Sequence, residues 1–197
     1  MDEIELVAYD PVWPAMYAAE AARVRAALPA GLVDAIEHFG STAVPGMTAK
    51  PVIDLLVAVR SLEEACAVAV APLVALGYAF WAGNPQRDRL FFVKGLPPSA
   101  PHRTHHLHVT ERDGKLWRQL LFRDYLRTHA DEAASYAALK QALAAQHPKD
   151  REAYTVAKTA YVAEIMAKAA VEGIRAHRLE GRFDWPTWKA WINEGRP

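Results

Sequence analysis

One carboxylate stands in an apolar run that is otherwise typical of a buried strand. Asp54 lies in the segment PVIDLLVAV, residues 51–59, where Ile53 and Leu55 flank it directly. Burying an unpaired carboxylate costs several kcal/mol, so this side chain needs a partner of opposite charge. Lys50 or an arginine could hold it as a structural acid, and a ligand-binding role is the alternative.

Four of the eight histidines fall in the segment PHRTHHLHV, residues 101–109. In a strand, His106 and His108 project to one face, because side chains alternate between the two faces. With Asp54 on a neighbouring strand, they could form a two-His-one-carboxylate site for a transition metal. They could instead hydrogen-bond a phosphate, or form only an exposed polar face of the strand.

A turn of small residues, Gly40-Ser41-Thr42, follows the alternating segment 33–39. Small residues let a backbone approach a phosphate closely and offer amide and hydroxyl donors to its oxygens. An ordinary tight turn between strands is the alternative. His38, two residues before Gly40, is expected on the same strand face, where it could contact a ligand or only satisfy a buried hydrogen bond.

Several basic residues lie beside the acidic strand or on helix faces that also carry apolar residues. They are Lys50, Arg89, Arg123, Arg127 and Lys158. For each one alone, a snorkelling side chain or an ion pair is an adequate explanation. Together they predict a basic pocket between a sheet and a helical half, because a phosphorylated ligand must be neutralised.

Five segments, in order, resemble the GrpB-like family of the nucleotidyltransferase superfamily. They are VAYDPVWPAMYAAEAARVRAAL, IEHFGSTAVPGMTAKPVIDLLVAV, THHLHV, LFRDYLRTHADEAASYAALK and DREAYTVAKTAYV, and they span most of residues 6–166. The resemblance implies an α/β (α+β) fold, with a nucleotidyltransferase-like mixed sheet followed by an antiparallel helical C-terminal half. Related domains are also found fused to some dephospho-CoA kinases, where an accessory role has been suggested.

The same resemblance implies roles for the polar residues. The turn from Gly40 would hold a nucleoside triphosphate, and Asp54 would bind Mg²⁺ that bridges its phosphates. His106 or His108 could orient or deprotonate an acceptor. The superfamily usually places a second carboxylate two residues after the first, but this chain has Leu56 there.

Two classes of function therefore stay open. The first is a nucleotidyltransferase that acts with a nucleoside triphosphate on an unknown acceptor. The second is a catalytically degenerate protein that binds a nucleotide or another phosphorylated small molecule, or a folding or interaction accessory. A further carboxylate beside Asp54 would favour catalysis, and Glu111 and Asp113 are weak candidates because a terminal turn is expected there.

The composition limits the alternatives. The chain has 197 residues, and its 23 basic and 23 acidic side chains cancel, so total charge gives no strong signal for nucleic acid or an anionic membrane. No apolar run reaches the length of a membrane span, and the acidic start does not resemble a secretion signal. With one cysteine, Cys66, these features predict a cytoplasmic protein.

Hydrophobic periodicity predicts strands first and helices afterwards. Strands are expected at 5–8, 33–39, 51–59, 78–81, 89–93 and 105–110, with helices at 14–28, 115–129, 131–146 and 151–172 and another that begins after Ser61. One domain would cover residues 1–172, with its sheet part at about 1–112 and its helical part at about 113–172. Residues 173–197 would form an extension whose tryptophans dock on the body or on the partner of a homodimer.

Overall fold

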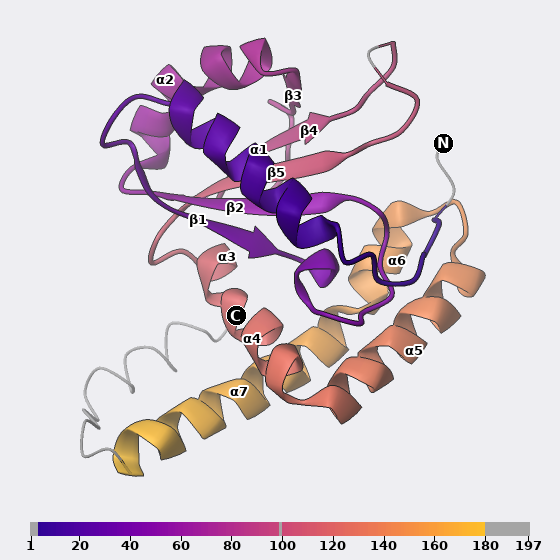
Figure 1. Cartoon of the computed structure of the whole chain (residues 1–197). Coiled ribbons are helices and arrows are strands. Elements are labelled where there is room, and N and C mark those ends of the chain that lie inside the picture. The colour runs from indigo at the N-terminus through magenta and orange to yellow at the C-terminus, as the bar shows by residue number, and fades with distance from the viewer. Residues whose placement is uncertain (1–3, 99, 180–197) are drawn as a thin grey trace.

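A five-stranded mixed sheet forms the centre of the structure, a computed structural model that describes residues 4–98 and 100–179. The strands lie in the order β1-β2-β5-β4-β3, as Figure 1 shows. Their bounds are β1 Val33–Phe39, β2 Ile53–Val59, β3 Tyr78–Phe80, β4 Leu90–Lys94 and β5 His105–Glu111. The central pair, β2 and β5, is parallel and the other pairs are antiparallel. The predicted α/β fold with a mixed sheet is therefore confirmed.

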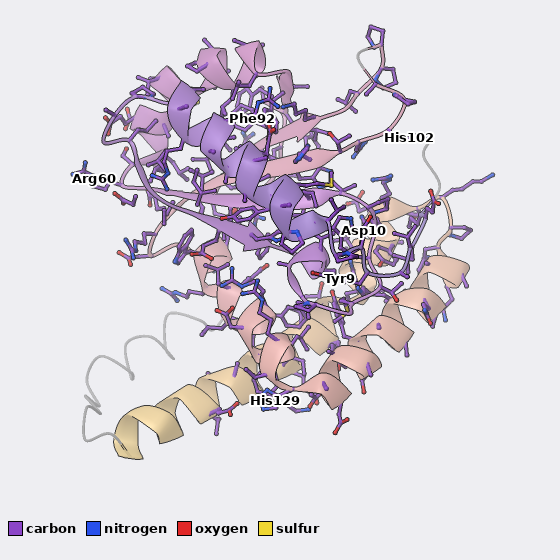
Figure 2. The ribbon with its side chains drawn as sticks, viewed as in Figure 1. Tyr9, Asp10, Arg60, Phe92, His102 and His129 are labelled. Carbon is purple, nitrogen blue, oxygen red and sulfur yellow. The ribbon has the colours of Figure 1, made fainter. Side chains whose placement is uncertain are left out.

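Two helices cover one face of this sheet, α1 Trp13–Ala27 and α2 Leu62–Ala75. Alternate residues of the strands, such as Leu55, Val57 and Leu107, are fully buried against them. Phe92 of β4 belongs to the same core and lies behind α1 in the view of Figure 2. The alternation predicted from the sequence thus places Asp54 and His106 on the opposite face, away from this core.

The helical half consists of α3 Lys115–Arg118, α4 Leu120–Thr128, α5 Ala130–Gln146, α6 Arg151–Ala157 and α7 Thr159–Leu179. It packs beside the sheet and not over α1 and α2 (Figure 1). A second apolar cluster joins Leu126, Tyr136 and Ile165 of these helices to Val44 and Met47. The loop between β1 and β2 therefore fills the space between the sheet and the helices.

Two predicted helices are each divided by a tight joint. The segment 115–129 becomes α3 and α4, and the segment 151–172 becomes α6 and α7. At the joints, the amides of Gln119 and Lys158 bond to carbonyls three residues back, those of Leu116 and Thr155. One such turn is too short to interrupt the apolar periodicity, so the periodicity does not signal it.

The predicted strand at 5–8 is wrong as a strand, because this segment makes only one bridge, from Val7 to Ala49. Just before this segment, the amide of Ile4 donates to the carbonyl of Pro148, 2.8 Å away. The N-terminal segment therefore ties the β1–β2 loop to the helical half.

The C-terminal extension was predicted to begin at residue 173, but α7 runs without interruption through that position to Leu179. The tryptophan-rich segment, with Trp185, Trp188 and Trp191, lies outside the described residues. No helix within residues 4–98 and 100–179 is long and apolar enough to cross a membrane.

Candidate functional site

Asp54 and His106 form a hydrogen-bonded pair. They are register partners on the parallel strands β2 and β5, and Nδ1 of His106 lies 3.0 Å from Oδ1 of Asp54. Burial alone would raise the pKa of Asp54, but the hydrogen bond and the positive charge of Lys50 bring that pKa below its usual value. An ionised carboxylate can only accept, so the shared proton belongs to His106 Nδ1.

The Gly40 turn lies directly against this carboxylate. Gly40 has φ 72°, a left-handed conformation, and a Cβ built on it would lie 2.3 Å from Oδ2 of Asp54. Only glycine combines that backbone angle with so close an approach. The residues that follow, Ser41–Ala43, form a short 3₁₀ turn that faces the helical half.

A cavity of about 290 Å³ opens where the Gly40 turn, the start of β2 and the helical half meet. Eight residues that the sequence singled out line it: Gly40, Ser41, Thr42, Lys50, Asp54, His106, Arg123 and Lys158. The helices add residues that sequence reasoning did not assign to a site, among them Tyr136, Lys140 and Tyr154. The predicted pocket between sheet and helices therefore exists, and it holds one more lysine than expected.

Three lysines, Lys50, Lys140 and Lys158, converge on two tyrosine rings in this cavity; we call them the lysine cluster. Nζ of Lys158 lies 4.0 Å from the ring centroid of Tyr154, and Nζ of Lys50 lies 5.5 Å from the same centroid. Nζ of Lys140 lies 5.0 Å from the ring of Tyr136 and donates to the carbonyl of Thr48. Cation–π contacts thus hold the ammonium groups inward.

The lysine cluster carries positive charge that nearby acids do not balance. Burial, and then repulsion from Lys158 and Lys50, lowers the pKa of Lys140 to about 7. Burial and Lys50 lower the pKa of Lys158 to about 8, although Asp54 opposes that shift. Burial also lowers the pKa of Lys50. Asp54 is the one acid among the described residues that line the cavity.

Arg123 also reaches the cavity, but its charge is already paired. This guanidinium bonds to Glu37 at 2.7 Å, to Asp124 at 2.7 Å and to the carbonyl of His38 at 2.8 Å. It therefore fastens α4 to β1. Two other arginines named from the sequence lie outside the cavity lining: Arg89 pairs with Asp88, and Arg127 donates to the carbonyl of Ala43.

His38 lies on the α1 side of the sheet. It stacks on Tyr17 with ring centroids 4.7 Å apart, its Nε2 lies 3.0 Å from Oγ1 of Thr42, and burial lowers its pKa to about 4. It does not line the cavity, and it supports the turn through Thr42. The expectation that it shares a face with Gly40 does not hold, because β1 ends at Phe39 and its alternation ends there too.

Comparisons with known proteins identify the family and support the fold. Residues 3–168 match the GrpB protein family. The chain belongs to the GrpB family. A UPF0157 protein of Pseudomonas aeruginosa is 51% identical over 169 residues, which are 85% of this chain and 68% of that protein. The crystal structure of the conserved protein GrpB from Enterococcus faecalis has a TM-score of 0.73 at 31% identity, and the match covers 84% of this chain and 96% of that one.

A third relative is named for an enzymatic activity. A dephospho-CoA kinase of Mycolicibacterium paratuberculosis is 31% identical over 189 residues, which correspond to 84% of this chain and 46% of the kinase. The GrpB-like region is thus part of a longer protein there, as the resemblance implied.

The carboxylates of this GrpB-family chain do not fit a two-metal centre at the cavity. Leu56 is buried on β2 opposite His108, and Glu111 lies at the far end of β5, where it accepts from the amide of Leu62. The residues that the structure describes contain no group of three His, Cys, Asp or Glu that could hold a metal ion. Asp54 alone could hold Mg²⁺, and only together with ligand phosphates and water.

His106 and His108 do not share one environment, although they lie on one strand face. His106 lines the cavity, and its Nε2 is buried with no hydrogen-bond partner among the described residues. His108 lies beside the rings of Phe91 and Phe39, at 4.7 and 5.9 Å between centroids, and burial lowers its pKa to about 3. His106 is therefore the histidine that faces a ligand in this cavity.

Lys140 is the member of the lysine cluster that sequence reasoning missed. Its position between Tyr136 and Leu143 repeats at helical spacing, and all three side chains are buried. A lysine at a buried position of an amphipathic helix is the same signal that singled out Lys158. Applied to the segment 131–146, that signal would have identified Lys140.

Proposed function

We propose that this GrpB-family chain binds a phosphorylated small molecule, of the nucleoside triphosphate class, with its phosphates in the lysine cluster. The observation that carries the proposal is the imbalance of charge: buried Lys140 and half-buried Lys50 and Lys158 face one cavity whose described lining holds the single acid Asp54. A bound polyanion would supply the missing negative charge and stabilise all three ammonium groups.

The turn at Gly40 adds neutral donors to this positive site. Ser41 and Thr42 line the cavity with Gly40, so hydroxyl and backbone donors lie on the wall next to Lys50. Such donors orient phosphate oxygens without adding charge. The cavity therefore offers the two kinds of contact that phosphate recognition uses.

Calorimetric titration of ATP and of tripolyphosphate into the wild-type chain tests this proposal. Lys158→Met should weaken both ligands by about ten-fold or more, because hydrogen bonds to charged groups contribute about 1.5–3 kcal/mol each. Lys115→Met, a change at an exposed lysine at the start of α3, is the matched control and should leave binding unchanged. Absence of binding to the wild-type chain would contradict the proposal.

Nucleotidyl transfer to an unknown acceptor is the second candidate. The pair of Asp54 and His106 beside the Gly40 turn favours it, because His106 Nε2 could accept the proton of an acceptor hydroxyl there. Asp54 is the side chain that could hold Mg²⁺ at the phosphates. Pyrophosphate release from ATP with Mg²⁺ that is lost in Asp54→Asn would support transfer. If ATP binds but no pyrophosphate is released with any of a panel of small alcohols and amines as acceptors, ligand binding without transfer is the function that remains.

A further inference from the structure

One imidazole nitrogen of His106 is unpaired in the ligand-free protein. Nε2 is buried and has no hydrogen-bond partner among the described residues, although unpaired buried nitrogens are uncommon in proteins. The ring is not closed off, because His106 lines the cavity and 14% of its side chain is exposed. An unpaired nitrogen therefore belongs to a ring that borders the space proposed for the phosphates, a setting that favours a chemical role.

The carboxylate of Asp54 determines which nitrogen of this ring carries the proton. Oδ1 of Asp54 lies 3.0 Å from Nδ1 of His106, and an ionised carboxylate only accepts, so Nδ1 is the protonated nitrogen. Nε2 then has a lone pair and no proton. The pairing of β2 with β5, in which Asp54 and His106 are direct partners, keeps the two side chains together. A neutral imidazole held in one tautomer is suited to nucleophilic attack.

The other polar groups of the cavity are less suited to attack phosphorus. Nζ of Lys158 and Nζ of Lys140 lie over tyrosine rings, and a bound polyanion keeps both amines protonated, so they have no lone pair. The hydroxyl groups of Ser41 and Thr42 attack only after a base has taken their proton. Nε2 of His106 needs no such activation.

We propose that Nε2 of His106 accepts the terminal phosphoryl group of the bound phosphoanhydride, which makes His106 a modification site. The lone pair of Nε2 forms a bond to the terminal phosphorus, and the bond between that phosphorus and its bridging oxygen breaks. The electron pair of the broken bond stays on the bridging oxygen of the leaving diphosphate, whose charge the lysine cluster neutralises. Nδ1 keeps its proton, and Asp54 stabilises the positive charge that the ring gains.

This inference rests on the proposed function, because the lysine cluster must first bind the phosphate chain. Incubation of the wild-type chain with ATP labelled at its terminal phosphate, in the presence of Mg²⁺, tests the inference. The chain should gain a label that acid releases and alkali does not, as expected for phosphorus bonded to an imidazole nitrogen. Peptide mapping by mass spectrometry should place the phosphoryl group on His106. ATP labelled at the α-phosphate should leave no label.

Matched histidine variants show whether the label depends on this one ring. His106→Gln should remove the label. His108→Gln changes the other histidine of the same strand face, and His102→Gln changes an exposed histidine of the loop before β5 (Figure 2); both should keep the label. The melting temperature and the tripolyphosphate affinity of each variant are measured alongside. Mapping on the wild-type chain gives an answer even where a variant does not fold.

Asp54 is a positioning residue in this step. Asp54→Asn keeps the size of the side chain, but an amide can hydrogen-bond to either tautomer of His106. The labelling rate at saturating ATP should fall by about 100-fold or more, because loss of the carboxylate that fixes a histidine tautomer can cost more than that. A changed dissociation constant for ATP with an unchanged labelling rate would contradict this role.

The outcomes separate the two proposals. If neither ATP nor tripolyphosphate binds to the wild-type chain, the proposed function fails. If ATP binds and no label appears, or the label maps to a lysine or to another histidine, the present inference is wrong and the proposed function stands. A label that persists in a folded His106→Gln chain would also overturn it. So would a label from the α-phosphate alone, since that result places nucleotidyl transfer at the protein.

Discussion

Lysines that are buried or half-buried occur on both sides of the sheet, and they differ in what surrounds them. On the α1 side of the sheet, Lys94 donates to Glu20 at 2.7 Å, and Tyr78 donates to the same oxygen at 2.9 Å. Burial raises the pKa of Glu20, but these hydrogen bonds bring it below its usual value. In the cavity, burial and then mutual repulsion lower the pKa values of Lys140 and Lys158, and the one acid nearby, Asp54, is already bonded to His106.

The difference separates a structural charge from a functional one. A buried ion pair whose hydrogen bonds are satisfied within the fold fastens one element to another, here α1 to β3 and β4. Buried charges of one sign lower the stability of the empty protein, and a ligand of opposite charge recovers that free energy on binding. Opposite responses to substitution should follow from this contrast.

The largest effect is expected from breaking the balanced pair. Glu20→Leu leaves Lys94 beside the core without its acid, so the free energy of unfolding should fall by about 3 kcal/mol. Urea denaturation at pH 7 measures this change. The double variant Glu20→Leu/Lys94→Met should recover a large part of the loss, because it leaves no unpaired charge. An unchanged midpoint in Glu20→Leu would show that the pair does not fasten α1 to the sheet.

A smaller loss is expected at Gly40, which holds the one acid of the cavity in place. Gly40→Ala places a methyl group 2.3 Å from Asp54 Oδ2 at a left-handed backbone position, and should destabilise the fold by about 2–3 kcal/mol. Gly31→Ala is the matched control, because Gly31 has φ 82° and no atom within 4 Å of its Cβ position. Gly31→Ala should lower the free energy of unfolding by only about 1 kcal/mol, the cost of a side chain at a left-handed backbone position. Equal losses in the two variants would contradict a close approach at Asp54.

The sequence predicted this region unevenly, for physical reasons. Strand alternation is a strict period of two, so β1 at Val33–Phe39 was predicted with its bounds, and the placement of His106 and His108 on one strand face was correct. Alternation stops where a strand stops, so it misplaced His38 relative to Gly40. Register between distant strands, which makes Asp54 and His106 direct neighbours, depends on tertiary pairing that no local pattern encodes.

The helical side was harder to predict. A lysine such as Lys140 is usually solvated, and here it is buried in contact with the carbonyl of Thr48 and the ring of Tyr136. The tight joint at Lys158 turns α6 relative to α7, and periodicity continues across it. Helical spacing could have marked Lys140 as buried, but its convergence with Lys50 and Lys158 on one cavity depends on how the helices pack.

Removal of an unbalanced lysine should have the opposite sign to removal of Glu20. Lys140→Met at pH 6, where Lys140 is protonated, should stabilise the ligand-free protein by about 1 kcal/mol, since the gain from removing a buried charge exceeds the lost hydrogen bond to Thr48. Tripolyphosphate should stabilise this variant less than it stabilises the wild-type chain. Thermal melts with and without the anion measure both effects. Destabilisation without the anion would show that the lysine cluster is balanced in the empty protein.

The most gradual effect is a dependence of stability on pH, and its sign follows from the lowered pKa values. Lysines of the unfolded chain titrate near pH 10.4, whereas Lys140 and Lys158 have pKa values of about 7 and about 8 in the fold. Above pH 7 the unfolded chain therefore binds more protons, and the free energy of unfolding should rise with pH, by up to about 1.4 kcal/mol per pH unit for each of the two lysines. Below pH 7 both states hold these protons, so the two lysines add no slope.

Urea denaturation at several pH values between about 7.5 and about 9.5 measures this slope. Histidine side chains titrate below this pH range, and tyrosine side chains titrate mainly above it. His38 and His108, whose pKa values are lowered by burial, contribute only at lower pH, and Tyr136, whose pKa is raised, contributes only at higher pH. Lys140→Met/Lys158→Met should flatten the slope, and so should saturating tripolyphosphate, because the bound anion keeps both lysines protonated. A slope that survives the double variant at full size would place its origin outside Lys140 and Lys158 and contradict their lowered pKa values.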